Sequence, residues 1–281
     1  MRVAFVTNNA SRRPAEVAAR LTGLDIPATA AEVVTSAQAA VRVVRAQVPP
    51  GAAVLVLGTA ALVDEVREAG LLPVRRLADA PDGTVAALVQ GLSPQTCQED
   101  LAEACVAVRA GALWVAGNSD TTLPSPRGHL PGNGAFVDVL RQVTGAEPVV
   151  AGKPDPTLHR ESVDRVGARR PLVVGDRLDT DVLGAVRGGS HSLLVLTGVE
   201  TPASLLAAPA GSRPTYLASD LRGLVEPHPE VVVSHQVARC RGATATCVDG
   251  RVVVAGDGDD ALRAQVALAW ASADAGRPVL G

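Results

Sequence analysis

The sequence predicts an α/β fold built on parallel sheet, and three observations support this prediction. Short apolar runs rich in β-branched residues alternate with amphipathic stretches of helical length, which is typical of βαβ units. The 281 residues are 47% apolar, enough to fill a sizeable core. The apolar residues are mostly Ala, Val and Leu, with only two Phe, two Trp and one Tyr, as suits strands buried between helices.

The first module alternates strand and helix and ends at Pro49, Pro50 and Gly51, which interrupt regular structure. Its expected elements are strands at residues 3–7 and 33–36 and helices at 14–21 and 37–47. A second module follows. Its expected elements are a strand at 54–58, a helix at 60–69, a helix near 95–110, a strand at 113–116 and a helix from 134 to 145.

The pattern of the first module resumes at Pro148. The expected elements are a strand leading to Lys153, a helix, a strand at 171–175, a helix ended by two glycines at 188 and 189, a strand at 192–196 and a segment to 225. In the last part, Asp249-Gly250 joins strands 244–248 and 251–255 through a turn compatible with type I′, and a helix runs from 260 to about 273.

Composition excludes several function classes. Lys and Arg number 26 against 29 acidic residues, so no broad basic surface is expected for nucleic acid or anionic lipid. The four cysteines form no CxxC pair and indicate free thiols in a reducing compartment. The apolar run at residues 3–6 is too short for a signal peptide or a membrane span. We expect a cytoplasmic protein with no nucleic-acid or membrane partner, and its oligomeric state, a homo-oligomer included, stays open.

The first strand ends in Thr7, Asn8 and Asn9, at an edge where ligands bind in open α/β sheets. Hydroxyl and amide groups there, followed by a helix N-terminus, can hold phosphate oxygens through neutral donors. The plainer alternative is an ordinary capped turn between a strand and a helix.

Two later strand ends carry charge. Pro154 favours an extended conformation at Lys153, whose ammonium can neutralise a phosphate, although most lysines are solvated surface groups. Asp176, Asp179 and Asp181 follow a buried strand, and a hard divalent cation relieves the repulsion between carboxylates held so close together. We expect Asp176 to be a direct metal ligand, Asp181 to lie in the first or second shell of ligands, and Asp179 to cap the next helix. A solvated acidic loop is the alternative.

These three strand ends, in this order, resemble motifs two, three and four of the haloacid dehalogenase (HAD) superfamily. Finer matches resemble subfamily IIA, the NagD-like, p-nitrophenylphosphatase and phosphoglycolate phosphatase-type hydrolases: TNNASR at 7–12, PGNGA at 131–135, GKPDP at 152–156, GDRLDTD at 175–181 and LLVLTGV at 193–199. The resemblance implies a Rossmann-like core with a large inserted α/β cap of the C2 type. The implied boundaries are 1–48 for the first part of the core without its first strand, 49–147 for the cap, 148–225 for the rest of the core and 226–281 for a small hairpin and helix extension.

The resemblance also implies Mg²⁺-dependent hydrolysis of a small phosphorylated metabolite through an aspartyl-phosphate. Its catalytic residues would be Lys153, Asp176 and Asp181, the two aspartates holding the metal. The phosphoryl group would be bound by Thr7, Asn8, Asn9 and Lys153. The cap loop that faces the substrate would contain Asn118, Asp120 and Thr122.

Family members carry a DxDG segment whose first Asp is the nucleophile, and residues 1–281 contain none. Asp79-Ala80-Pro81-Asp82-Gly83 has the wrong spacing, and Asp257-Gly258-Asp259 follows the second arm of a hairpin. We therefore expect the true start to lie upstream by roughly 30 residues or more, one βαβ unit's worth. The alternative is a catalytically inactive HAD homologue that binds a phosphometabolite. A nicotinamide-dependent oxidoreductase is disfavoured, because no GxGxxG follows a predicted strand.

Overall fold

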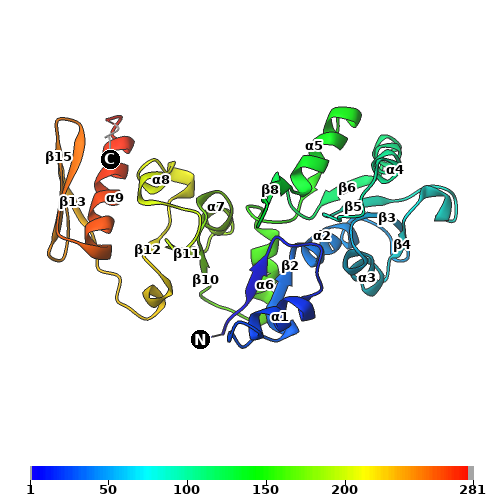
Figure 1. Cartoon of the computed structure of the whole chain (residues 1–281), viewed down its shortest axis with the longest axis horizontal. Coiled ribbons are helices and arrows are strands. Elements are labelled where there is room, and N and C mark those ends of the chain that lie inside the picture. Colours follow the sequence, from blue (N-terminus) through cyan, green and yellow to red (C-terminus); the bar gives the residue numbers. More distant parts are fainter. Residues whose placement is uncertain (1, 278–281) are drawn as a thin grey trace. The chain divides into compact units, whose positions relative to one another are not determined.

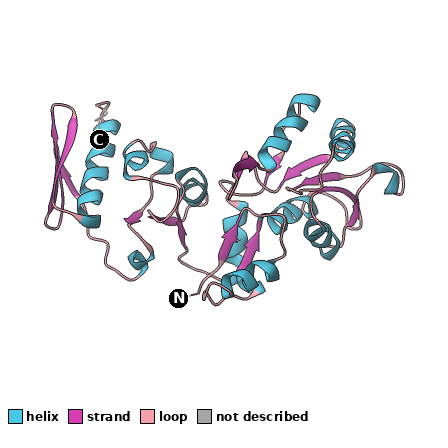
Figure 2. Ribbon diagram, viewed as in Figure 1, coloured by secondary structure: helices cyan, strands magenta, loops and turns pink. Residues whose placement is uncertain are grey.

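The computed structural model describes residues 2–277 and divides the chain into two compact units, residues 1–169 and 170–281 (Figure 1). Each unit has its own sheets and its own buried cores. Both units contain parallel sheet flanked by helices, so the predicted α/β class is confirmed (Figure 2). Within the described residues, no helix is long and apolar enough to cross a membrane.

The first unit begins with a two-stranded parallel sheet, in which β1 (Phe5–Thr7) pairs with β2 (Val33–Thr35). Helix α1 (Pro14–Thr22) connects the two strands, with Pro14 at its first position, where a missing N–H costs nothing. Helix α2 (Ser36–Arg45) starts directly after β2, because the side chain of Thr35 accepts the N–H of Gln38 and caps it. These elements match the predicted ones to within two residues.

A five-stranded parallel sheet follows, in the order β4-β3-β5-β6-β9. Its strands are β3 (Ala53–Leu57), β4 (Leu72–Val74), β5 (Ala87–Gln90), β6 (Leu113–Ala116) and β9 (Val149–Val150). Val54 and Val56 pack on one face against α2, α3 (Ala60–Glu68) and α6 (Thr157–Val166). Leu55 and Leu57 pack on the other face against α4 (Gln98–Arg109) and α5 (Asn133–Thr144).

Three strand regions of this unit were not predicted. Pro73 lies within β4, and it is tolerated because β4 is the edge strand of the sheet. β5 is a four-residue run, too short for periodicity to identify. β7 (Thr122–Ser125) and β8 (Gly128–Pro131) form a hairpin. All residues of β8 are exposed to solvent, so its sequence has no alternation of apolar and polar residues that would predict a strand.

The second unit contains a three-stranded parallel sheet in the order β10-β11-β12. Its strands are β10 (Leu172–Gly175), β11 (His191–Val195) and β12 (Tyr216–Ala218). The predicted helix before Gly188 begins as a π-helical turn, Leu178–Val182, and continues as α7 (Leu183–Arg187). Helix α8 (Pro202–Leu206), which was not predicted, follows β11 and starts at a Thr201 cap.

Residues 226–277 form an antiparallel sheet with one long helix. The sheet runs in chain order through β13 (Val232–Ser234), β14 (Val237–Cys240), β15 (Ala243–Val248) and β16 (Arg251–Ala255), and the helix is α9 (Gly258–Asp274). The predicted turn is confirmed, because Asp249 and Gly250 have φ of 50° and 75°, both positive as type I′ requires. Strands β13 and β14 were not predicted.

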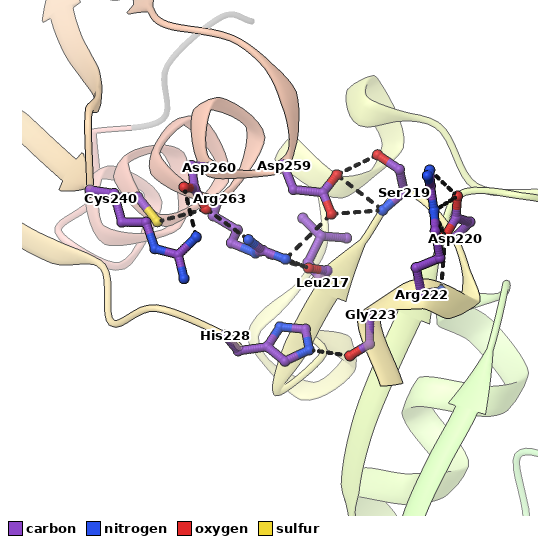
Figure 3. A network of polar contacts seen from close by, with 11 residues as sticks. Leu217, Ser219, Asp220, Arg222, Gly223, His228, Cys240, Asp259, Asp260 and Arg263 are labelled. Atoms are coloured by element: carbon purple, nitrogen blue, oxygen red, sulfur yellow. Dashed lines mark hydrogen bonds and ion pairs between the residues drawn. The ribbon is translucent and has the colours of Figure 1, made fainter. Parts of the chain in front are cut away.

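Helix α9 contacts two cores. Ala264 and Leu268 pack against the antiparallel sheet, whereas Val266 packs with Leu205 and Leu217 beside the parallel sheet. Polar bonds at the start of α9 attach it to the end of β12 (Figure 3). The extension is therefore built into the second unit.

Candidate functional site

The loop after β1 is shaped by its own polar side chains. The hydroxyl of Thr7 accepts the backbone N–H of Asn9 at 3.2 Å. The side-chain oxygen of Asn9 accepts the backbone N–H groups of Ser11 and Arg12 at 2.8 and 3.1 Å. These bonds form an Asx turn that directs the chain into α1. The Thr7 hydroxyl still has its own proton to donate.

Asn8 is at the centre of the polar site in the first unit. Its Oδ1 accepts the backbone N–H of Lys153 at 2.8 Å, and its Nδ2 donates to the Lys153 carbonyl at 3.1 Å. The same Nδ2 lies 3.3 Å from Oδ2 of Asp120. The Asn8 carbonyl accepts the Ser36 hydroxyl at 2.6 Å and Nδ2 of Asn118 at 2.7 Å. The predicted residues Asn8, Asn118, Asp120 and Lys153 are thus brought together.

Asn118 and Asp120 lie in the loop that follows β6. Asn118 is buried, and its Oδ1 accepts the backbone N–H of Asp120 at 3.2 Å. Nδ2 of Asn133, at the start of α5, donates to the Asn118 carbonyl at 2.7 Å. At Gly132, a Cβ atom would lie 2.2 Å from the Asp120 carbonyl oxygen. The glycine and asparagine of the PGNGA segment therefore hold the cap loop in place.

Lys153 is the only lysine of the 281 residues, beside 25 arginines. A compact ammonium and a planar guanidinium are not interchangeable at a site that positions a point charge. Lys153 is therefore the only side-chain ammonium that these 281 residues offer for such a site. The lysine count was available from the sequence, and sequence reasoning missed it.

The second unit holds the acidic cluster after β10. Oδ2 of Asp176 accepts the backbone N–H of Val199 at 2.9 Å. Asp181 is buried in the π-helical turn, where its Oδ2 accepts the backbone N–H of Arg177 at 3.3 Å. A Cβ atom on Gly175 would lie 2.3 Å from Cγ of Asp181, so only glycine leaves room for this carboxyl group.

Asp179 differs from its predicted role. It does not lie at the N-cap position but inside the turn, and it forms an ion pair with Arg177, with Nη2 2.6 Å from Oδ2. The hydrogen bond from Arg177 lowers the pKa of Asp179. The charge of Asp179 is already compensated by this arginine.

Asp176 and Asp181 offer an all-oxygen set of carboxylate donors, which suits Mg²⁺. Glu200 is nearby, and its Oε1 accepts the backbone N–H of Leu178 at 3.0 Å. Across residues 2–277, no group of three or more His, Cys, Asp or Glu side chains is arranged to hold a metal ion. The carboxylate oxygens of Asp176 and Asp181 are of the kind that a hard cation takes, and two carboxylates would fill only part of its coordination shell.

Comparison with known proteins extends over both units. A family model described as haloacid dehalogenase-like hydrolase matches residues 1–72, and one described as HAD-hydrolase-like matches residues 150–224. The D-glycerol 3-phosphate phosphatase of Mycobacterium tuberculosis is 50% identical over 273 residues, which are 95% of this chain and 76% of that protein. An acid sugar phosphatase of Staphylococcus saprophyticus is 37% identical over 224 residues, covering 79% of this chain and 83% of that protein.

Solved structures agree with these matches. The crystal structure of the glycerol phosphate phosphatase from M. tuberculosis in complex with magnesium is similar with a TM-score of 0.83 and 48% identity. The similarity covers 99% of this chain and 82% of that chain.

Proposed function

The chain belongs to the haloacid dehalogenase-like hydrolase family, and on that premise we propose that it hydrolyses phosphate monoesters of small polyols of the glycerol 3-phosphate class, with Mg²⁺. The substrate class is taken from the relative that is 50% identical over nearly the whole of this chain. The observation that supports the site most strongly is the single lysine of the chain, bonded through its backbone to Asn8.

Most of the predicted residues have a direct role in this proposal. The Thr7 hydroxyl donates to a phosphate oxygen, and the ammonium of Lys153 compensates the charge of the phosphoryl group. Asp176 and Asp181 hold Mg²⁺, which would supply further charge stabilisation to the phosphoryl group when bound. Asp120, at the start of the cap loop, faces the polyol part of the substrate, and buried Asn118 supports it through the Asp120 N–H.

The nucleophile stays a prediction. The aspartyl-phosphate route needs the DxDG segment, which residues 1–281 do not contain. The second candidate is a homologue that binds a phosphometabolite without hydrolysing it. The intact mass of the protein from its native host, compared with 28.6 kDa, tests for an upstream segment.

Phosphate release from D-glycerol 3-phosphate (sn-glycerol 1-phosphate), followed by ³¹P NMR with and without Mg²⁺, tests the proposed function. We expect Lys153→Met to lower the rate by about 100-fold or more, because the ammonium that compensates the negative charge of the phosphoryl oxygens is lost. Arg20→Met is the matched control, since it removes an exposed cation of α1. Unchanged release in Lys153→Met would contradict the assigned role. Binding of glycerol 3-phosphate without release, in a chain whose native mass is 28.6 kDa, would establish the second candidate.

A further inference from the structure

We propose that the side chain of Asn8 is a positioning group for Lys153 and not a ligand of the phosphoryl group. The inference rests on the proposed function in one respect, that Lys153 serves the phosphoryl group. Sequence reasoning assigned the Asn8 amide to phosphate. The contacts of that amide in the structure point to a different use.

The amide of Asn8 holds the backbone of Lys153 at two points. Oδ1 accepts the Lys153 N–H at 2.8 Å, and Nδ2 donates to the Lys153 carbonyl at 3.1 Å. Both bonds join residues 145 positions apart in the sequence. Two bonds to one residue fix both the position and the rotation of its peptide groups, so the direction of the Lys153 side chain depends on Asn8.

The donors of this amide are fully engaged. Nδ2 has two hydrogens, one for the Lys153 carbonyl and one for the carboxylate of Asp120, 3.3 Å away. The opposite orientation would place the amide nitrogen against the N–H of Lys153 and the amide oxygen against two acceptors. A phosphate oxygen would have to displace Lys153 or Asp120 to gain an Nδ2 hydrogen.

The backbone of Asn8 is fixed independently. Its carbonyl accepts the Ser36 hydroxyl at 2.6 Å and Nδ2 of Asn118 at 2.7 Å. Gly152 lies against the same group, because a Cβ atom there would be 2.8 Å from Oδ1 of Asn8 and 2.4 Å from the Gly117 carbonyl. Asn8 thus links the end of β1, the start of α2, the cap loop and the segment that carries Lys153.

Asn9 provides the contrast within the same loop. Its side-chain oxygen accepts two backbone N–H groups and the Ser11 hydroxyl of its own turn. No bond of the Asn9 side chain reaches Lys153 within the described residues. Two adjacent asparagines of one motif therefore do different work, Asn9 shaping its loop and Asn8 placing the lysine.

The single lysine makes a direct test possible. Protein grown with [α-¹⁵N]lysine gives one backbone amide signal, that of Lys153, and its N–H is the group bonded to Asn8. The measurement is the exchange rate of this N–H in D₂O. We expect slow exchange in the wild type and about tenfold faster exchange in Asn8→Ala, the effect of losing one hydrogen bond.

Three comparisons separate local positioning from general loosening. Asn8→Asp keeps the acceptor but sets a carboxylate oxygen against the Lys153 carbonyl and the Asp120 carboxylate, so it should also accelerate the exchange. Asn9→Ala, the matched control, should leave the exchange unchanged. The indole N–H of Trp114, which donates to buried Gln90 at 2.9 Å, reports on the same unit and should exchange at the wild-type rate in Asn8→Ala. If both signals accelerate equally, Asn8 is only structural and the proposal fails.

Titration with inorganic phosphate distinguishes this proposal from the proposed function. If phosphate shifts the Lys153 signal and Asn8→Ala both accelerates its exchange and weakens phosphate binding, both proposals stand. If phosphate shifts nothing but Asn8→Ala accelerates exchange, the positioning role stands and the phosphatase assignment falls. If Asn8→Ala weakens phosphate binding with unchanged exchange, Asn8 is a ligand and the proposal is wrong. If Asn8→Ala does not fold, the wild-type protein still tests the proposal. A Lys153 N–H that exchanges as fast as that of an unstructured peptide would overturn the positioning role.

Discussion

Replacing Arg263 by Met should destabilise the second unit strongly, because this arginine attaches α9 to the parallel sheet. Nε and Nη2 of Arg263 donate to the Leu217 carbonyl at 3.0 and 2.8 Å (Figure 3). Nη1 donates to Asp260 at 2.8 Å, and Nη2 lies 3.3 Å from Asp259. The Arg263 side chain is only 9% exposed, so water cannot replace these bonds in the folded state.

The expected magnitude follows from what the substitution leaves behind. Removing one partner of a buried ion pair costs about 3–5 kcal/mol, because the other charge stays buried and uncompensated. The side chains of Asp259 and Asp260 are 21% and 23% exposed, and Asp260 also lies 3.6 Å from Arg241. Partial solvation and this second cation reduce the cost, so we expect a loss of about 2–3 kcal/mol in the free energy of unfolding.

Arg222→Met is the matched control. Arg222 also pairs with an aspartate, with Nη2 2.6 Å from Oδ2 of Asp220, but its side chain is 76% exposed (Figure 3). The change of residue type is identical, whereas the burial differs. We expect no measurable change in unfolding for this variant.

Urea unfolding followed by ¹⁹F NMR of 5-fluorotryptophan measures the effect in one unit at a time. The chain has two tryptophans, Trp114 in the first unit and Trp270 in the second. The midpoint for Trp270 should fall in Arg263→Met, and the midpoint for Trp114 should not move. Equal midpoints for Trp270 in Arg263→Met and Arg222→Met would refute the argument from burial.

Two further outcomes test other parts of the structure. Burial, with a smaller contribution from Glu68, raises the pKa of half-buried Glu65 from 4.5 to about 7. Between these pH values the folded protein binds a proton that the unfolded protein does not, so the free energy of unfolding falls as the pH rises from about 4.5 to 7. Glu65→Gln should remove this decline and stabilise the first unit at pH 8 by about 1–2 kcal/mol, and equal stability of the two proteins at pH 8 in urea unfolding would count against it. At Gly198 a Cβ atom would lie 2.0 Å from Oδ2 of Asp176, so Gly198→Ala should displace this carboxylate. We expect the affinity for Mg²⁺, measured by calorimetry, to fall about tenfold or more. An unchanged affinity would show that Asp176 does not bind the metal.

Local patterns were sufficient to predict much of the fold. The alternation of strand and helix placed β1, β2, β3, β6, β10 and β11 correctly, because each is an apolar run with a clear break at its ends. β4 was missed because proline argues against a strand until its place at the sheet edge is known. β13 was missed because all three of its residues are exposed, and β14 because the apolar partners of Ala238 and Cys240 lie on α9, more than 20 residues along the chain.

The positions of the candidate site residues were easier to predict than their bonds. Thr7 ends β1 and Asp176 directly follows β10, whereas Lys153 lies three residues after β9 and Asp181 lies in the π-helical turn. The engagement of the Asn8 amide with Lys153 depends on the fold bringing together residues 145 apart, which no local pattern encodes. The expected cap at Asp179 was wrong because the turn begins earlier: Arg177 is at the N-cap position, and Asp179 forms a bidentate ion pair with it.

Helix α9 packs against two sheets, so both halves of the second unit depend on it. One side of the helix covers Leu205 and Leu217, and the indole N–H of Trp270 donates to the Leu205 carbonyl at 2.8 Å. A chain shortened to residue 225 would therefore expose apolar side chains beside the parallel sheet of this unit. Residues 226–277 therefore supply part of the packing of the parallel sheet in this chain.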